Sequence, residues 1–191
     1  MTVESGKPTP EAQLQSFYDR INPVQQKFIR SVQAAVRKRL PTANELVYDY
    51  GSFFVISYSP TDKGIDGIVS IATRADRVEL YFNHGPLLPD PKQLLLGSGK
   101  LTRFIRIEAV RQLAHPDVEA FIAAAIDHSS VALPSRGKGR LVIKANKTVA
   151  AKKPSRLPEL VEASSEMKRS VCHQRARWPR GASHFCQSRQ N

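Results

Sequence analysis

Two carboxylates four residues apart are the side chains in this sequence with the most evident capacity for chemistry. Glu45 completes a capping-box pattern that begins at Thr42, and this pattern predicts a short helical turn over residues 46–50, which contains Asp49. On a helix, side chains four residues apart lie on one face. Paired carboxylates can bind a hard cation through oxygen or divide acid and base roles. The alternative is that Glu45 serves only as the capping residue of the turn.

Aromatic side chains and a histidine form a second candidate site. The alternation of apolar and polar residues over 78–83 puts Glu79 and Tyr81 on one face of a strand, which is exposed to water or lines a cavity. Aromatic residues around that strand can wall a pocket in which His84 supplies a titratable group, although such a cluster is equally typical of a core. Because no Ser/His/Asp or Cys/His arrangement accompanies them, we predict binding without catalysis and without a cofactor.

A glycine turn with a lysine is the third candidate. In Gly97-Ser98-Gly99-Lys100 the lysine is followed by Leu101 and a strand, whereas a phosphate-binding loop needs Ser or Thr there and opens a helix. We interpret Lys100 and Arg106 as a cationic rim for an acidic ligand, with a solvated strand edge as the alternative. The candidate ligand-binding residues are Tyr48, Tyr50, Glu79, Tyr81, His84, Lys100 and Arg106.

Helical periodicity and cap residues predict the elements that position these side chains. Helices are expected to begin at Pro10, Pro23 and Pro116, each behind a capping residue or with acids in the first turn. Short connections between the first strands indicate an antiparallel meander. We therefore predict an α+β fold in which a four- to five-stranded antiparallel meander sheet packs against helices on one side. The strands are predicted over 52–58, 68–73, 78–83 and 103–108.

The 191-residue chain carries a formal net charge of +12, and this charge is unevenly distributed. Residues 1–134 hold 15 Lys/Arg against 14 Asp/Glu, whereas residues 135–191 hold 14 against 3. We predict a disordered leader over 1–9, one domain over 10–134 and a basic, mostly disordered tail over 135–191, in which 140–144 fit an edge strand. Only this tail is basic enough to bind nucleic-acid phosphates.

The positions of the cysteines and the hydropathy pattern indicate the cellular compartment of the protein. Cys172 and Cys186 both lie in the tail, so no disulfide framework supports the domain. With His173 and His184 they offer zinc-ligand types, but their spacing matches no zinc-finger rule. No apolar leader and no apolar run of about 20 residues occurs, so we expect a cytoplasmic protein that does not associate with a membrane.

One part of the sequence resembles a known family. The residues that carry the resemblance are Glu45-Leu-Val-Tyr-Asp-Tyr-Gly51, Val78-Glu-Leu-Tyr-Phe82, Leu94-Leu-Leu-Gly-Ser-Gly-Lys-Leu-Thr-Arg-Phe-Ile-Arg106 and a helix that begins at Pro116. Together they resemble the YdhG-like family, a bacterial domain of unknown function, over about residues 10–128. The resemblance implies a small α+β fold that has been likened to frataxin. One relative has been called an intracellular iron chaperone, and for iron binding Glu45 and Asp49 are the natural ligands.

Three functions from different classes remain open at this point. The first is a noncatalytic YdhG-like domain that binds a small ligand or a protein partner through the face bearing Glu79 and Tyr81, or through the cationic rim. The second is a frataxin-like iron carrier that uses Glu45 and Asp49. The third is a protein that binds nucleic acid nonspecifically through its basic tail.

Overall fold

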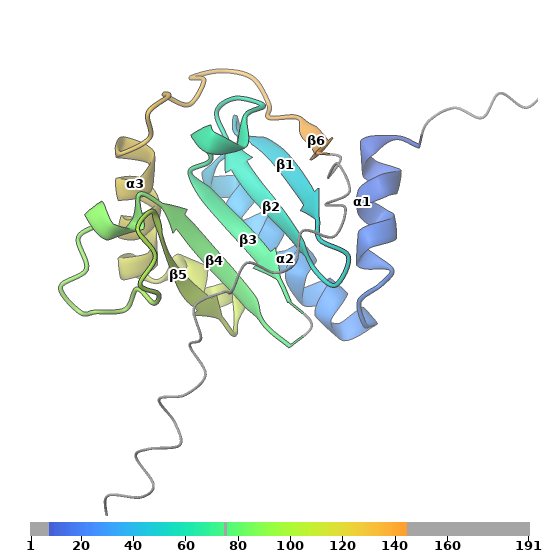
Figure 1. Cartoon of the computed structure of the whole chain (residues 1–191), viewed down its shortest axis with the longest axis horizontal. Helices are drawn as coiled ribbons and strands as arrows, with labels where there is room; N and C mark the ends of the chain where they lie inside the picture. Colours follow the sequence, from blue (N-terminus) through green and yellow to red (C-terminus); the bar gives the residue numbers. More distant parts are fainter. Residues whose placement is uncertain (1–7, 75, 145–191) are drawn as a thin grey trace, which may run out of the picture. The chain divides into compact units, whose positions relative to one another are not determined.

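The computed structural model describes residues 8–74 and 76–144 (Figure 1). The remainder of the predicted leader, residues 1–7, and the tail beyond residue 144 lie outside the described residues. The described part holds three α-helices, which are α1 (Pro10–Tyr18), α2 (Pro23–Arg39) and α3 (Pro116–Asp127). Its six strands are β1 (Asn44–Asp49), β2 (Phe54–Ser59), β3 (Val69–Thr73), β4 (Val78–Asn83), β5 (Thr102–Ile107) and β6 (Leu141–Lys144). Short 3₁₀ turns η1 (Gly64–Asp66), η2 (Gly85–Leu87) and η3 (Val110–Ala114) lie in the connections.

The strands form a single sheet in the order β5-β4-β3-β2-β1-β6. Strands β1 to β5 are an antiparallel meander, and β6 pairs in parallel with β1 at the edge. Helices α2 and α3 lie behind the same face of this sheet in Figure 1. The predicted α+β class is confirmed, but the sheet has six strands rather than four to five, and it is mixed rather than purely antiparallel.

Residues 44–49 form strand β1, so the predicted helical turn over 46–50 and its capping box are wrong. Strand β1 is paired along both edges, with β2 on one side and β6 on the other. Its backbone groups therefore find partners along both edges, which a single helical turn could provide only in part. Leu46 and Val47 point to opposite faces of the sheet and are both fully buried, as a central strand requires.

The hydrophobic core lies between the sheet and the helices. Strand register aligns one apolar residue from each of five strands across this inner face, namely Val47, Ile56, Ile71, Leu80 and Ile105. The helices α2 and α3 contribute apolar side chains to this core, which are Ile29, Val32, Val36, Val118, Phe121, Ile122 and Ala125. The predicted caps are also present, since Asn22 accepts a hydrogen bond from the backbone N–H of Gln25 at 2.9 Å.

The strand β6 extends the sheet ten residues beyond the domain boundary predicted at residue 134. Its approach is fixed by backbone hydrogen bonds, from Gly139 N–H to the Pro41 carbonyl (3.0 Å) and from Glu45 N–H to the Arg140 carbonyl (2.8 Å). A Cβ atom at position 139 would overlap the carbonyl oxygen of Ala43, so only glycine permits this close approach. The residues 135–144 therefore belong to the folded domain.

Within residues 8–74 and 76–144, no helix combines the length and the hydropathy needed to cross a lipid bilayer.

Candidate functional site

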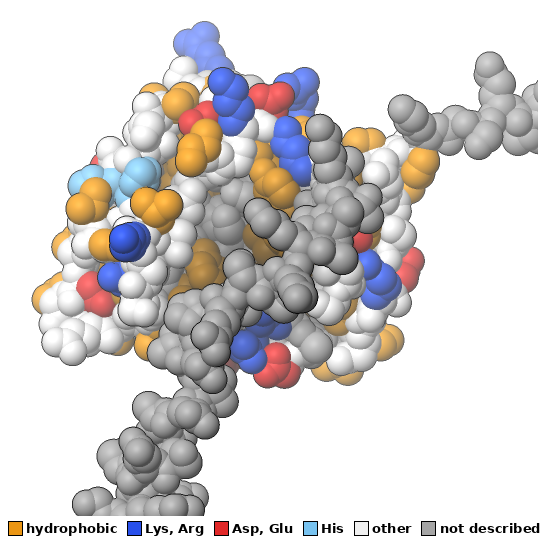
Figure 2. All heavy atoms as spheres, viewed as in Figure 1, with side chains coloured by type: hydrophobic (Ala, Val, Ile, Leu, Met, Phe, Trp, Pro, Cys, Tyr) orange, Lys and Arg blue, Asp and Glu red, His pale blue; other side chains and the backbone are white. Residues whose placement is uncertain are grey.

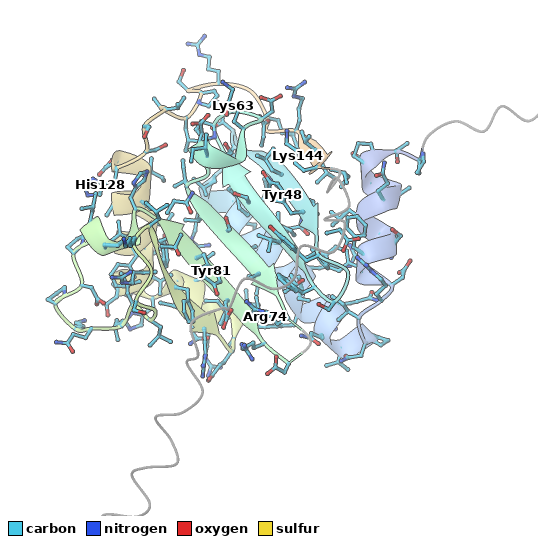
Figure 3. All side chains as sticks on the ribbon, viewed as in Figure 1. Tyr48, Lys63, Arg74, Tyr81, His128 and Lys144 are labelled. Carbon is cyan, nitrogen blue, oxygen red and sulfur yellow. The ribbon has the colours of Figure 1, made fainter. Side chains whose placement is uncertain are left out.

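The face of the sheet opposite α2 and α3, here called the outer face, carries the polar side chains of the central strands. Register places Tyr48, Val55, Ala72, Glu79 and Arg106 in one row across five strands. Figure 3 shows Arg74 and Tyr81 near each other on the side of the sheet turned toward the viewer. In the space-filling view of this side, hydrophobic side chains lie among Lys and Arg side chains (Figure 2).

A cavity of about 310 Å³ opens on the outer face. Its aromatic wall comes from Tyr50 and Phe53, whose rings stack with centroids 4.9 Å apart, and from Tyr81. Polar groups complete the lining, and the side chain with a full positive charge among them is Arg74. The lining residues are Tyr50, Phe53, Val55, Ser70, Ala72, Arg74, Tyr81, Asn83 and Thr102.

The guanidinium of Arg74 is held in place from two sides. Its Nε lies 3.2 Å from a carboxylate oxygen of Glu79, and its Cζ lies 4.8 Å from the ring centroid of Phe53. Glu79 is only 3% exposed, and its other oxygen is 2.9 Å from Nε of Arg77. The Tyr81 hydroxyl donates a hydrogen bond to Glu79 at 3.0 Å. Glu79 is thus a paired carboxylate that positions a cation and a phenol beside the cavity.

Burial raises the pKa of the Tyr81 hydroxyl, and the hydrogen bond with Arg74 partly opposes this effect. The phenol therefore remains a neutral donor at physiological pH. Burial also raises the pKa of Tyr48, with a smaller contribution from Tyr50. A Cβ atom at Gly64 would overlap the Tyr48 hydroxyl, so this side chain packs over η1 and does not line the cavity.

The predicted ligand-binding residues fall into three groups. Tyr50 and Tyr81 line the cavity, and Glu79 positions Arg74 beside it. Tyr48 and Arg106 share the outer face but lie outside the cavity, and Arg106 instead borders a separate recess of about 430 Å³ near the β3–β4 turn. His84 and Lys100 stand apart from both.

His84 is half-buried and directly follows β4, and its backbone adopts the left-handed conformation with φ = 55°. Lys100 is exposed in the loop before β5. Because β5 begins only at Thr102, strand alternation does not bring Lys100 onto one face with Arg106. The predicted cationic rim is therefore not assembled by the described strands.

The carboxylates of Glu45 and Asp49 do not fit a shared iron site. They lie on a strand, where four residues span about 13 Å, rather than on a helix. Each is paired with a different arginine: Glu45 lies 2.9 Å from Nη2 of Arg37, and Asp49 lies 2.8 Å from Nη2 of Arg20. Across the described ranges, no group of three or more His, Cys, Asp and Glu residues is arranged to hold a metal ion.

Arg74 is the cation of this cavity, and the sequence analysis did not identify it. The alternation of the chain carries a signal for it, since Ser70, Ala72 and Arg74 share one face while Val69, Ile71 and Thr73 share the other. Phe53, just before β2, and Val55 and Ser57 within it show the same alternation. Only the pairing of these strands places Phe53 and Arg74 against each other.

No family model matches the chain, and comparison with curated proteins and with solved structures found no match.

Proposed function

We propose that this protein is a noncatalytic binding module whose outer face binds a small, flat molecule with an acidic group. The observation that carries this proposal is Arg74, which is fixed by Glu79 and Phe53 at the border of a cavity. The cavity volume of about 310 Å³ is at the small end of the range for ligand sites, which begins at ~300 Å³. Its combination of aromatic wall and one cation suits an aromatic or unsaturated carboxylate.

The chemistry of the lining supports this ligand class. An aromatic body can stack along Tyr50 and Phe53, since stacked ring pairs contribute about 0.5–1.5 kcal/mol beyond the burial of area. The carboxylate of the ligand would receive hydrogen bonds from the N–H groups of Arg74 that neither Glu79 nor Tyr81 uses. Ser70, Asn83 and Thr102 offer further polar groups along one side of the cavity.

The resemblance to YdhG-like domains belongs to the same proposal. What supports it is the sequence pattern, together with an α+β architecture of the kind that the resemblance implies. The resemblance points to a binding module but does not identify its ligand.

The test is titration of the full chain with benzoate and indole-3-acetate, followed by chemical-shift changes of backbone amides. We expect shifts concentrated at residues 50–55 and 70–74, and binding about tenfold weaker for Arg74→Gln because the charge-assisted hydrogen bonds are lost. Arg74→Lys should retain part of the affinity. The matched control is Arg106→Gln, which removes a cation from the same face outside the cavity.

Benzamide provides a comparison that requires no variant, because it keeps the ring and lacks the charge. We expect it to bind the unaltered protein more weakly than benzoate. Equal binding of the two compounds, or equal effects of Arg74→Gln and Arg106→Gln, would contradict the role given to Arg74.

A further inference from the structure

A second cavity, of about 770 Å³, lies between α1, α2 and the loop that leads into β6. In Figure 1, α1 lies beside the β6 edge of the sheet. This cavity shares no lining residue with the one on the outer face. Four cationic side chains line it, Arg30 and Arg37 from α2 and Lys138 and Arg140 from the loop, together with the acids Glu11 and Glu45.

One cation and one acid in this cavity neutralise each other. Arg37 binds Glu45 through Nη2 at 2.9 Å and through Nε at 3.1 Å, and its Nη1 donates to the Ala43 carbonyl at 2.5 Å. Glu45 is only 7% exposed and also accepts a hydrogen bond from Gln33. This pair therefore joins α2 to β1 and leaves the other cations without a compensating carboxylate at the floor of the cavity.

Three cations thus face one remaining acid, Glu11. Arg30 uses Nη2 to donate to Gln15 at 2.7 Å and lies over the Tyr18 ring at 3.9 Å, which leaves its other N–H groups available. Lys138 and Arg140 are exposed, and their side chains have no hydrogen-bond or ion-pair partner among the described residues. The cavity consequently has an excess of uncompensated positive charge.

The backbone that carries Lys138 and Arg140 is fixed even though their charged ends are not. Gly139 lies between them against Ala43, where no larger residue fits, and donates to the Pro41 carbonyl. The N–H of Arg140 donates to Oδ1 of Asn44 at 2.9 Å. Because this backbone is already fixed, a ligand that binds Lys138 and Arg140 would cost little backbone entropy.

We propose that this cavity binds a small molecule that bears a phosphate or diphosphate group, held by Arg30, Lys138 and Arg140. Phosphate carries more charge than a carboxylate and accepts hydrogen bonds from several directions, which suits two guanidiniums and an ammonium that line one cavity from two elements. A cavity of about 770 Å³ is within the usual range for small-molecule sites, ~300–1,000 Å³, and leaves room for an organic group beside the phosphate. The site lies apart from the outer face and does not rest on the function proposed for it.

The test uses the full chain and isothermal titration with inorganic pyrophosphate and with ADP at low salt. We expect Lys138→Ala/Arg140→Ala to weaken pyrophosphate binding at least about tenfold, because two charge-assisted contacts are removed. The matched control is Lys38→Ala/Arg136→Ala, which removes the same charge at exposed positions outside the cavity. Unchanged circular dichroism would show that each variant folds.

The two probes separate the sources of the phosphate. Tighter binding of ADP than of pyrophosphate would support an organic phosphate, and equal binding would support recognition of the phosphate groups alone. Equal weakening by both double variants would overturn the proposal in favour of nonspecific attraction to a basic protein. Binding of an oligothymidylate that depends on Lys138 and Arg140, without binding of pyrophosphate, would overturn it in favour of a nucleic-acid surface.

Discussion

Gln33 is the centre of a half-buried polar cluster that joins α1 and α2 to the sheet. Its side-chain oxygen accepts a hydrogen bond from the Tyr18 hydroxyl at 2.6 Å, and its backbone carbonyl accepts one from the Tyr58 hydroxyl at 3.1 Å. The cluster continues through Glu45 to Arg37. Because both tyrosines are fully buried, their hydroxyls must stay protonated to avoid placing a negative charge in the interior.

Burial is the main cause that raises the pKa of both Tyr18 and Tyr58 above the ordinary value, and the Glu45 carboxylate adds to this effect. A raised pKa in the folded state means that the associated stability is complete below the pKa of the unfolded chain, near 10, and is lost as pH rises above it. We therefore expect the free energy of unfolding to fall above about pH 10, by up to about 1.4 kcal/mol per pH unit for each tyrosine.

The measurement is urea unfolding at a series of alkaline pH values, with tyrosinate absorbance recorded on the folded protein. Tyr18→Phe/Tyr58→Phe should be less stable at neutral pH but should show a shallower decline above pH ~10. Tyr50→Phe, at a side chain that is 55% exposed, is the control and should keep the steep decline. If all five tyrosines ionised together near pH ~10 without unfolding, the account of burial would be wrong.

At the scale of elements, β6 is held by backbone contacts rather than by a large apolar surface. It pairs in parallel with β1 over four residues, and its own side chains are only half-buried. The segment before it makes the close approach at Gly139 and the turn at Gly137, where φ is +103°. Glycine is therefore needed at 139 for the close contact with Ala43 and at 137 for the positive φ angle.

We expect Gly139→Ala to displace β6, because the added methyl would overlap the Ala43 carbonyl in a backbone contact that cannot yield cheaply. The expected loss of stability is about 1–3 kcal/mol, with loss of hydrogen-exchange protection in β6 and at Glu45. Gly137→Ala is the control, since a Cβ there meets nothing within 4 Å. It should cost about 1 kcal/mol through its backbone conformation and leave β6 protected.

The two variants give distinguishable exchange patterns. Retention of protection in β6 by Gly139→Ala would show that the strand docks without the close approach and would contradict this prediction.

At the scale of the whole molecule, the residues that complete the sheet also change the charge of the folded domain. Residues 8–144 hold 18 Lys/Arg against 13 Asp/Glu, so the domain is more basic than the near-neutral body predicted over 10–134. The increase comes from the loop and strand at 136–144, which carry Arg136, Lys138, Arg140 and Lys144. The charge of this segment is therefore part of the surface of the folded protein.

A chain that stops after Pro134 should be less stable than one that stops after Lys144. The shorter chain lacks Leu141 and Ile143, which pack against the core, and it leaves the edge of β1 unpaired. We expect a difference of about 2–3 kcal/mol in the free energy of unfolding by urea, with greater self-association of the shorter chain. Equal unfolding midpoints would show that β6 contributes nothing to the fold.

Local sequence signals were enough to predict the helices that begin at Pro10, Pro23 and Pro116, because caps and apolar stripes act over a few residues. The alternation over 78–83 likewise placed Glu79 and Tyr81 on the outer face. The candidate site was predicted only in part, through Tyr50, Glu79 and Tyr81, since these residues carry their own signal in an alternating or aromatic segment.

The tertiary structure alone decided the conformation of residues 44–49 and the contacts of Arg74. Strand pairing joins β1 to residues about a hundred positions away in β6, and this nonlocal pairing outweighs the local capping pattern at Thr42. Arg74 acquires its role from Phe53, which lies just before β2, and from Glu79 on β4. Hydrogen bonds between strands depend on register, and register is set by the whole sheet rather than by any one segment.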